Sequence, residues 1–256
     1  MTGIDLGSRT VKIVAVQDGA IIRQAVYDTI SFYRNYAKIV QGQLVLERTG
    51  LGLDGNDIIA TGYGKITAPL AGGRLLPEIQ AHVWGAKYQT GESDFILLDI
   101  GGQDSKVICV RQGRAVDFLT NDRCAAGSGR YLENMAQIIG MDLDVLGDHY
   151  LEPVALASTC AIFSETEIIS RIVEGCSDKS LAAGINHALY MRLAPMLKKL
   201  AGPKVLLAGG GAANRALRYF IEKDLHIEAV PLPFAQINGA LGCCAWGIEQ
   251  MYKERV

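Results

Sequence analysis

Two segments of the chain repeat one pattern of aspartate, glycine, lysine and apolar residues, and this pattern can hold a phosphate group and its magnesium ion. Residues 4–19 (IDLGSRTVKIVAVQDG) recur without a gap as residues 98–113 (LDIGGQDSKVICVRQG). Each copy predicts an apolar strand ending in an aspartate, a tight polar turn and a second strand closed by a glycine turn. Glycine at the bend lets backbone N–H groups converge on phosphate oxygens, and the aspartate suits Mg²⁺.

The turns of both copies supply the candidate nucleotide-binding residues. These are Asp5, Gly7, Ser8, Arg9, Thr10 and Lys12 in the first copy, and Gly101, Gly102, Gln103 and Asp104 in the second. We expect Asp5 and Asp99 to face each other across a cleft and to share one Mg²⁺ ion. Two ordinary hairpins with structural glycines are the alternative. A third cluster, Gly209-Gly210-Gly211 between an apolar strand and a helix start, favours the nucleotide, because a base or ribose can lie on bare backbone.

Composition excludes several classes of function. The chain has 256 residues, a net charge of -2 and an isoelectric point near 6.1, so it carries no electrostatic footprint for nucleic acid or an anionic membrane. It opens inside its first expected strand, which leaves no room for a signal peptide, and no apolar run approaches the ~20 residues that span a bilayer. Six cysteines without secretory context indicate reduced thiols. The sequence therefore predicts a cytoplasmic protein.

Strands followed by helices in both halves predict an α/β fold. Strands are expected up to residue 27 and at residues 57–60, 154–157, 205–208 and 227–230. The expected helices are 77–87, 128–139 and 165–174, a long helix from residue 179, one from residue 213 and a final helix, and residues 31–48 form a mixed amphipathic stretch. The final helix is expected to pack back on the first half. The predicted domains are 1–93 with 235–256, carrying the first phosphate loop, and 94–234, carrying the second.

Two cysteines precede predicted amphipathic helices. Cys124 lies in NDRCAAGSGRYLE, and the apolar positions that follow it are Tyr131, Leu132, Met135, Ile138 and Ile139. Cys160 lies in STCAIFSETE, where Ser164 and Glu167 form a capping-box pattern and the apolar stripe is Ile168, Ile169, Ile172 and Val173. The helix dipole favours thiolates, and an anionic cluster bound to them. Two cysteines cannot complete a four-thiolate cluster, but two chains related by a twofold axis can.

The two phosphate loops and the later glycine cluster resemble the actin, hexokinase and Hsp70 superfamily. The resemblance implies two ribonuclease-H-like subdomains with a nucleotide cleft between them. It makes residues 5–8 the first phosphate loop, residues 99–103 the second and residues 209–211 the adenosine loop. Asp99, Gln103 and Glu78 are the expected catalytic residues, with Glu78 orienting the attacking water; a surface carboxylate favoured by the helix dipole is its alternative. Gly127, Asn214 and Gln236 complete the expected nucleotide-binding set.

Three segments make the resemblance specific to one family within this superfamily. DIGGQDSKV at 99–107, NDRCAAGSGRYLE at 121–133 and STCAIFSETE at 158–167 resemble the activator family of 2-hydroxyacyl-CoA dehydratases, with relatives serving benzoyl-CoA reductases and double-cubane cluster proteins. TGYG at 61–64 and NGALG at 238–242 extend the likeness. It implies a homodimer holding one [4Fe-4S] cluster through Cys124 and Cys160 of each subunit. ATP hydrolysis would drive low-potential electrons from ferredoxin or flavodoxin to a cluster-containing enzyme.

Several residues depart from this family pattern or suit other interpretations. Arg9 replaces a small hydroxyl residue, and no cysteine lies near Ala81. Cys109 is expected in the core, Cys243 and Cys244 at small apolar helix positions and Cys176 as an exposed thiol. A cluster built within one chain from Cys124, Cys160, Cys176 and one of the late pair is the alternative. His82 is expected to be a hydrogen-bonded helix histidine. A small-molecule kinase using Glu78 or Asp104 as base, and a nucleotide-sensing module without catalysis, remain alternative functions.

Overall fold

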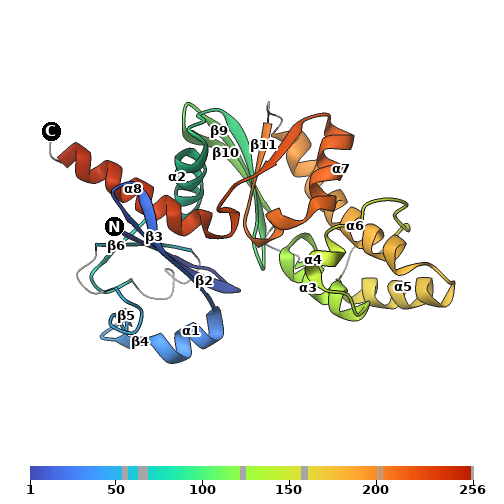
Figure 1. Ribbon diagram of the computed structural model, residues 1–256, viewed down its shortest axis with the longest axis horizontal. Coiled ribbons are helices and arrows are strands. Elements are labelled where there is room, and N and C mark those ends of the chain that lie inside the picture. The colour runs from blue at the N-terminus through green and yellow to red at the C-terminus, as the bar shows by residue number, and fades with distance from the viewer. Residues whose placement is uncertain are drawn as a thin grey trace. The chain divides into compact units, whose positions relative to one another are not determined.

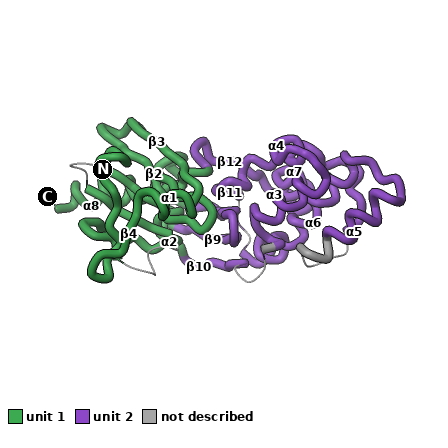
Figure 2. The backbone as a smooth tube through the Cα atoms, turned by 90° about the horizontal axis from the view of Figure 1, so that it is seen from below, with its two compact units in different colours: residues 1–93, 112–115, 236–256 green, residues 94–111, 116–235 purple. Residues whose placement is uncertain are grey.

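The computed structural model describes residues 1–53, 57–62, 69–121, 125–156, 161–200, 202 and 204–254. The chain divides into two compact units (Figure 2). Unit 1 comprises residues 1–93, 112–115 and 236–256, and unit 2 comprises residues 94–111 and 116–235. Among the described residues, no helix is both long enough and apolar enough to cross a membrane.

Unit 1 is built on a five-stranded sheet in the order β3-β2-β1-β6-β7. Its strands are β1 (Thr2–Leu6), β2 (Thr10–Gln17), β3 (Ala20–Asp28), β6 (Ile58–Thr61) and β7 (Gly73–Leu75). Strand β1 pairs antiparallel with β2 and parallel with β6. Every residue of central β1 is buried, whereas exposed and half-buried residues alternate along the edge strand β3.

The sheet of unit 2 has the same topology. Its order is β10-β9-β8-β11-β12, with β8 antiparallel to β9 and parallel to β11. Its strands are β8 (Phe95–Ile100), β9 (Ser105–Arg111), β10 (Arg114–Asn121), β11 (Lys204–Ala208) and β12 (Glu228–Pro231). The duplication seen in the sequence therefore extends from two hairpins to two whole sheets.

Side chains on the two faces of β2 pack into different hydrophobic cores, one on each face of the unit 1 sheet. Val11 and Ile13 pack in a core that also holds Phe32 of α1 (Thr29–Tyr36), beside the hairpin of β4 (Ala37–Val40) and β5 (Gln43–Leu46). Val14 and Val16 pack instead on α8 (Asn238–Glu254). Helix α8 lies alongside α2 (Glu78–Thr90) on this second face (Figure 1). The final helix thus packs on the first half, as predicted.

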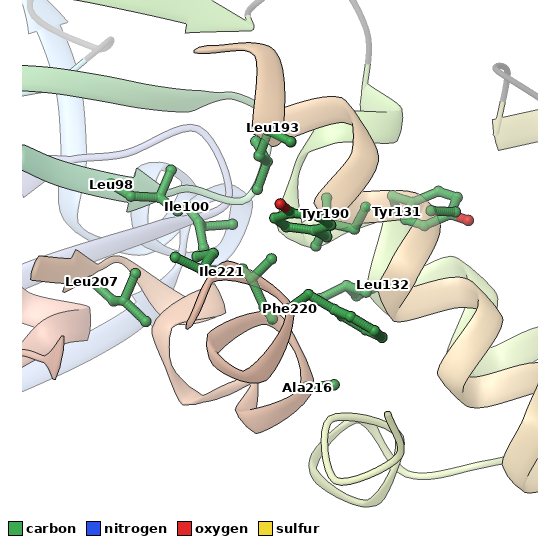
Figure 3. Packing of buried hydrophobic residues seen from close by; sticks show 14 of the residues in the cluster. Leu98, Ile100, Tyr131, Leu132, Tyr190, Leu193, Leu207, Ala216, Phe220 and Ile221 are labelled. Carbon is green, nitrogen blue, oxygen red and sulfur yellow. The ribbon is translucent and has the colours of Figure 1, made fainter. Parts of the chain in front are cut away.

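Helices of unit 2 share one large core with its sheet. The helical elements are η2 (Ala125–Gly127), α3 (Gly129–Ile138), α4 (Leu143–Leu146), α5 (Ala161–Val173), α6 (Asp178–Lys199), η3 (Gly210–Ala213) and α7 (Arg215–Leu225); η4 (Ala235–Ile237) then leads to α8. Figure 3 shows Tyr190 and Leu193 of α6 among side chains of α7, including Phe220 and Ile221. The ring centroids of Tyr190 and Phe220 are 5.9 Å apart. Aromatic packing therefore joins α6 to α7.

Three expectations from the sequence are wrong. Residues 154–156 form no strand, because the Val154 N–H donates to Ser180 O, 3.1 Å away at the start of α6. Ser164 does not cap a helix, since α5 begins one turn earlier and includes it. The predicted stripe of α5 is not a buried face, because Ile168 is fully buried but Ile169, Ile172 and Val173 are 52%, 46% and 84% exposed.

Candidate functional site

Both repeat copies fold as the strand–turn–strand units that the sequence predicts. The register places Asp5 opposite Lys12 in unit 1 and Asp99 opposite Lys106 in unit 2. Each copy closes with two residues at positive φ, Asp18-Gly19 in the first and Gln112-Gly113 in the second. The two halves therefore present the same aspartate–lysine pair at the end of a buried central strand.

The carboxylate of Asp5 lies in a confined polar setting. Asp5 is 5% exposed, and the Lys12 ammonium donates to its Oδ2 over 3.1 Å. Two glycines flank the carboxylate: a Cβ at Gly62 would lie 2.7 Å from Oδ1, and a Cβ at Gly239 would lie 3.4 Å from Oδ2. A side chain at Gly62 would collide with the carboxylate, so glycine there leaves space beside Oδ1, the oxygen that Lys12 does not hold.

His82 of α2 borders the same space. A Cβ at Gly239 would lie 3.2 Å from His82 Nε2, so this nitrogen and Asp5 Oδ2 both face Gly239. The Asn238 amide nitrogen lies 3.3 Å from His82 Nδ1 and donates to His82 O over 3.0 Å. Gln89 Nε2 donates to Asn238 Oδ1 over 2.9 Å, which fixes the amide orientation. Because Asn238 presents a donor, neutral His82 accepts at Nδ1 and carries its proton on Nε2.

Asp99 has a comparable glycine beside it. Asp99 is 3% exposed, and a Cβ at Gly209 would lie 2.8 Å from its Oδ1. Gly209 follows Ala208, which pairs with Asp99, just as Gly62 follows Thr61, which pairs with Asp5. Both glycines have positive φ, +95° at Gly62 and +78° at Gly209, a conformation that other residues rarely adopt. Gly62 is therefore the unit 1 counterpart of Gly209, a role that the sequence analysis missed.

The remaining residues of the two turns differ in their contacts. Lys106 Nζ donates to Asp104 Oδ2 over 2.6 Å, and Gly101 N donates to Asp104 O over 2.9 Å, which closes the second turn. Arg9 forms an ion pair with Asp28 at 2.9 Å. Hydrogen bonds from Ser31, chiefly from its backbone N–H, and the nearby Arg9 hold the pKa of Asp28 below its ordinary value. Ser8 and Gln103 are exposed, while Gly7, Thr10 and Gly102 are half-buried.

The glycine cluster of unit 2 is anchored by two buried asparagines. Gly209 precedes η3, which contains Gly210 and Gly211, and Asn214 then caps α7 through Oδ1, which accepts from Leu217 N at 2.8 Å. Asn214 Nδ2 donates to Asn186 Oδ1 over 2.8 Å. Fully buried Asn186 of α6 donates in turn to Leu146 O and His149 O, at 2.7 and 2.9 Å. Both polar ends of the Asn214 side chain are therefore engaged within unit 2.

The other expected nucleotide-site residues lie at element boundaries. Glu78 is the half-buried first residue of α2, where the helix dipole favours its charge. Gln236 lies exposed in η4. Gly127 ends η2, and its carbonyl accepts a 2.6 Å hydrogen bond from Ser105 Oγ. Glu78 and Gln236 thus belong to unit 1, and Gly127 belongs to unit 2.

The two cysteines predicted to hold a cluster, Cys124 and Cys160, lie outside the described residues. Within the ranges that the structure describes, no three side chains of histidine, cysteine, aspartate or glutamate gather to hold a metal ion. Cys109, Cys243 and Cys244 are buried among apolar residues, as expected for core positions, and Cys176 is half-buried after α5. Burial raises the pKa of Cys244 to about 12, so this thiol stays protonated at neutral pH.

Known proteins match almost the whole chain. A model of the BadF/BadG/BcrA/BcrD ATPase family matches residues 2–247. The (R)-2-hydroxyglutaryl-CoA dehydratase activating ATPase of Acidaminococcus fermentans is 33% identical over 257 aligned positions, which cover 98% of each chain. The 2-hydroxyisocaproyl-CoA dehydratase activator of Clostridioides difficile is 32% identical over 258 positions, 97% of this chain and 94% of the relative.

A solved structure also matches from end to end. The activator of the 2-hydroxyisocaproyl-CoA dehydratase from Clostridium difficile, with bound ADPNP, has a TM-score of 0.85 at 27% identity. The match covers 100% of this chain and 96% of that one. Together with the two five-stranded sheets of identical order, this likeness confirms the expected fold class, an α/β protein with two subdomains of the actin-like ATPase type.

Proposed function

Because this chain belongs to the BadF/BadG/BcrA/BcrD ATPase family, as DIGGQDSKV and the two cysteine segments predicted, we propose that it is an ATP-hydrolysing activator. In this proposal it delivers low-potential electrons to a cluster-containing enzyme of the 2-hydroxyacyl-CoA dehydratase or double-cubane type. The observation that carries the proposal is the duplicated hairpin with its buried aspartate opposite a lysine, in a chain that matches dehydratase activators over nearly its full length.

Three loops bind ATP or ADP in this proposal. The β1–β2 loop (residues 7–10) and the β8–β9 loop (residues 101–104) contact the phosphates, with backbone N–H groups and the Lys12 ammonium offsetting the phosphate charge. The segment 209–214 binds the adenosine, and Gly127 and Gln236 complete the site. Asn214 acts there as a positioning residue, because its side chain holds α7 and Asn186.

The aspartates suit a nucleotide-bound Mg²⁺ ion. Asp5 and Asp99 are buried carboxylates beside glycines, and Mg²⁺ binds through one or two carboxylates together with waters and phosphate oxygens. When bound, the ion would neutralise charge on the transferring phosphate. Glu78, Asp99 and Gln103 are the side chains we assign to positioning the attacking water. Lys12 holds one oxygen of Asp5 and so fixes the direction in which the carboxylate presents its other oxygen.

The electron-transfer part of the proposal rests on Cys124 and Cys160. We propose that each subunit of a homodimer supplies these two thiolates to one [4Fe-4S] cluster, which would store a single electron. Helix α5 begins at the residue after Cys160, and α3 begins five residues after Cys124, so both thiolates would lie near helix N-termini. Ferredoxin or flavodoxin is the proposed donor.

ATP hydrolysis is tested through the two aspartates. We expect Asp5→Asn and Asp99→Asn each to lower the Mg²⁺-dependent ATPase rate at least about a hundredfold, because metal-based charge stabilisation supplies several kcal/mol. Asp117→Asn is the control, since Asp117 lies exposed on β10 and its Oδ1 accepts from the neighbouring Phe118 N. Wild-type rates in either variant would exclude the proposed nucleotide site.

Cluster binding has a separate optical test. Protein purified without oxygen is expected to be brown and to hold about four irons per dimer, and Cys124→Ala or Cys160→Ala should abolish the cluster while ADP still binds. Cys109→Ala is the matched control, because Cys109 is a buried core thiol. A colourless, iron-free wild type after reconstitution would exclude the electron-transfer role and leave the ATPase assignment standing.

The small-molecule kinase alternative lacks a specific observation in its favour. It needs a carboxylate base beside an acceptor hydroxyl. Asp104, one of its two candidate bases, is held at 2.6 Å by Lys106. ATP turnover without any added alcohol distinguishes the activator from such a kinase.

A further inference from the structure

The N-terminus of α3 is hydrogen-bonded to the second phosphate loop. Gly129 N donates to Gly101 O over 2.9 Å, and Arg130 N donates to Gly102 O over 3.0 Å. Ser128, the N-cap residue, donates from Oγ to Gly102 O over 3.2 Å. The first N–H groups of a helix have no acceptor within the helix, and here the carbonyls of the phosphate loop take that place.

A fourth hydrogen bond joins the same two segments in the opposite direction, with its donor at the end of the phosphate loop and its acceptor just before α3. Ser105, the first residue of β9, donates from Oγ to Gly127 O over 2.6 Å. Ser105 and Ser128 are both completely buried. Breaking these bonds without replacement would leave buried polar groups unsatisfied, which is costly. We call this set of contacts, between residues 101–105 and residues 127–130, the loop–helix clamp.

Unit 1 contains a looser version of the clamp. Thr29, the first residue of α1, donates from Oγ1 to Gly7 O over 2.7 Å and from its backbone N to Arg9 O over 3.3 Å. The first phosphate loop is thus also bonded to the helix that follows the third strand of its sheet. Among the described residues, unit 2 has four such bonds and unit 1 has two, and two of the unit 2 donors are fully buried serines. The tighter clamp therefore belongs to the half whose helix follows Cys124.

We propose that the loop–helix clamp couples nucleotide occupancy at residues 101–104 to the position of α3. The inference rests on the proposed function, because it takes the β8–β9 loop as a phosphate site. A phosphate that shifts the carbonyls of Gly101 and Gly102 must carry the N-terminus of α3 with them or break buried hydrogen bonds. Ser105 and Ser128 are accordingly positioning residues: they touch no phosphate, but they transmit the conformation of the loop to the segment that carries Cys124.

Hydrogen–deuterium exchange on the full chain tests the clamp. We expect a nonhydrolysable ATP analogue with Mg²⁺ to slow exchange at residues 101–105 and, by about fivefold, at residues 129–133 of the wild type. In Ser105→Ala and in Ser128→Ala, the loop should keep its nucleotide protection while the response of α3 becomes clearly smaller, because each variant loses one of the four bonds of the clamp. Ser128→Thr retains the hydroxyl at the N-cap and should restore the response. A merely structural serine would instead change exchange equally with and without nucleotide.

Ser170→Ala is the matched control. Ser170 Oγ also donates to a backbone carbonyl, that of Thr166 at 3.1 Å, but on the exposed side of α5. The control should keep the wild-type response of α3. Loop protection with an unchanged α3 response in both alanine variants would overturn the clamp alone. No loop protection in the wild type would overturn the nucleotide site, and the clamp with it. If Ser105→Ala fails to fold, Ser128→Ala decides.

Discussion

Asn238 determines which nitrogen of His82 carries the proton, although 156 positions separate the two residues in the chain. With Nδ1 accepting from the amide, the Nε2–H group faces the space beside Gly239, where Asp5 Oδ2 also lies. A donor in this position can hold a carboxylate oxygen, or a water bound to it, in one orientation. His82 is thus a hydrogen-bonded histidine, as predicted, and its Nε2 atom borders the proposed metal site.

Two substitutions at His82 distinguish the roles of its two ring nitrogens. We expect His82→Asn, which keeps a polar atom near Nδ1 but has none near Nε2, to weaken Mg²⁺-dependent ADP binding about tenfold, the effect of losing a hydrogen bond to a charged group. His82→Gln places its amide near Nε2 and should bind ADP almost as well as the wild type. Isothermal titration calorimetry provides the comparison.

The control for this pair is Tyr88→Phe on the same helix, which removes only the exposed hydroxyl that donates to Gly19 O. It should leave ADP affinity unchanged. Equal affinities of the Asn and Gln variants would show that Nε2 has no role at the site.

Cys244 makes stability depend on pH in the alkaline range. Burial raises its native pKa from 9.0 to about 12, so above pH 9 the unfolded chain loses a proton that the native chain retains. The free energy of unfolding should therefore fall as pH rises from 9 toward 12, more steeply than in Cys244→Ala. The extra slope approaches about 1.4 kcal/mol per pH unit for one proton. Urea unfolding of both proteins across this range checks it; parallel slopes would contradict a buried, protonated thiol.

Helix α6 positions residues 209–214, the segment proposed to bind adenosine. The Asn186 amide nitrogen donates to Leu146 O and His149 O, and Asn214 Nδ2 donates to Asn186 Oδ1. Three hydrogen bonds, two of them fully buried, therefore centre on the Asn186 side chain. Through them α6 holds both the end of α4 and the N-cap of α7. Such a network stabilises the fold only while each of its polar groups has a hydrogen-bond partner, because a buried group without a partner still bears the cost of losing its water.

Asn186→Ala removes all three bonds at once. We expect it to lower the free energy of unfolding by about 3 kcal/mol, since unsatisfied buried groups cost roughly 1–3 kcal/mol each and partial relaxation offsets part of the sum. Asn214→Ser keeps a side-chain oxygen at the N-cap of α7 and loses the bond to Asn186, so its loss of stability should be smaller. Urea denaturation measures both, and an Asn186→Ala value within experimental error of the wild type would contradict the network.

Local patterns predicted the elements whose signals are local. The apolar strands ending in aspartate and the glycine-containing turns predicted both hairpins, and Pro77 marked the start of α2. The N-cap predicted at Ser164 was wrong because a capping-box pattern one turn inside a helix looks the same as one at the start of a helix. Residues 154–156 misled because a short apolar run does not reveal that its backbone bonds to α6. The α5 stripe misled because periodicity does not say which apolar face is covered.

Long-range contacts were beyond the reach of these patterns. The equivalence of Gly62 and Gly209 depends on which strand pairs with β1 and with β8, and the flanking residues, Thr61 and Ala208, share no chemistry. Asn238 and His82 meet only because α8 packs on α2. The aspartates and the glycines of the two turns could therefore be predicted as candidates, whereas Gly62, Gly239 and the side chains that orient His82 could not.

Unit 1 is completed by the last helix of the chain. Val14, Val16 and Ile59 belong to the cores that Leu241, Cys243 and Cys244 of α8 help to bury. We expect a chain ending at residue 235 to lose amide protection in β1, β2 and β6 and to retain it in β8, β9 and β11, whose core includes no residue of α8.

Hydrogen exchange measured by mass spectrometry follows these strands individually. The control is a chain ending at residue 251, which loses only the exposed turn 252–254 and the two residues beyond it. The amide protection of this control should match that of the wild type in every strand. Equal protection of β1 and β8 in the chain ending at 235 would show that unit 1 does not depend on α8.

The position of α8 late in the sequence also sets the order in which the two units complete their cores during translation. Strands of unit 1 emerge first, but residues 94–235 must be translated before the helix that covers Val14 and Val16 exists. At ordinary elongation rates this interval is on the order of ten seconds. Unit 2 therefore completes its core while the older half still displays an apolar sheet face, and a holding chaperone acting on the nascent chain would bind there.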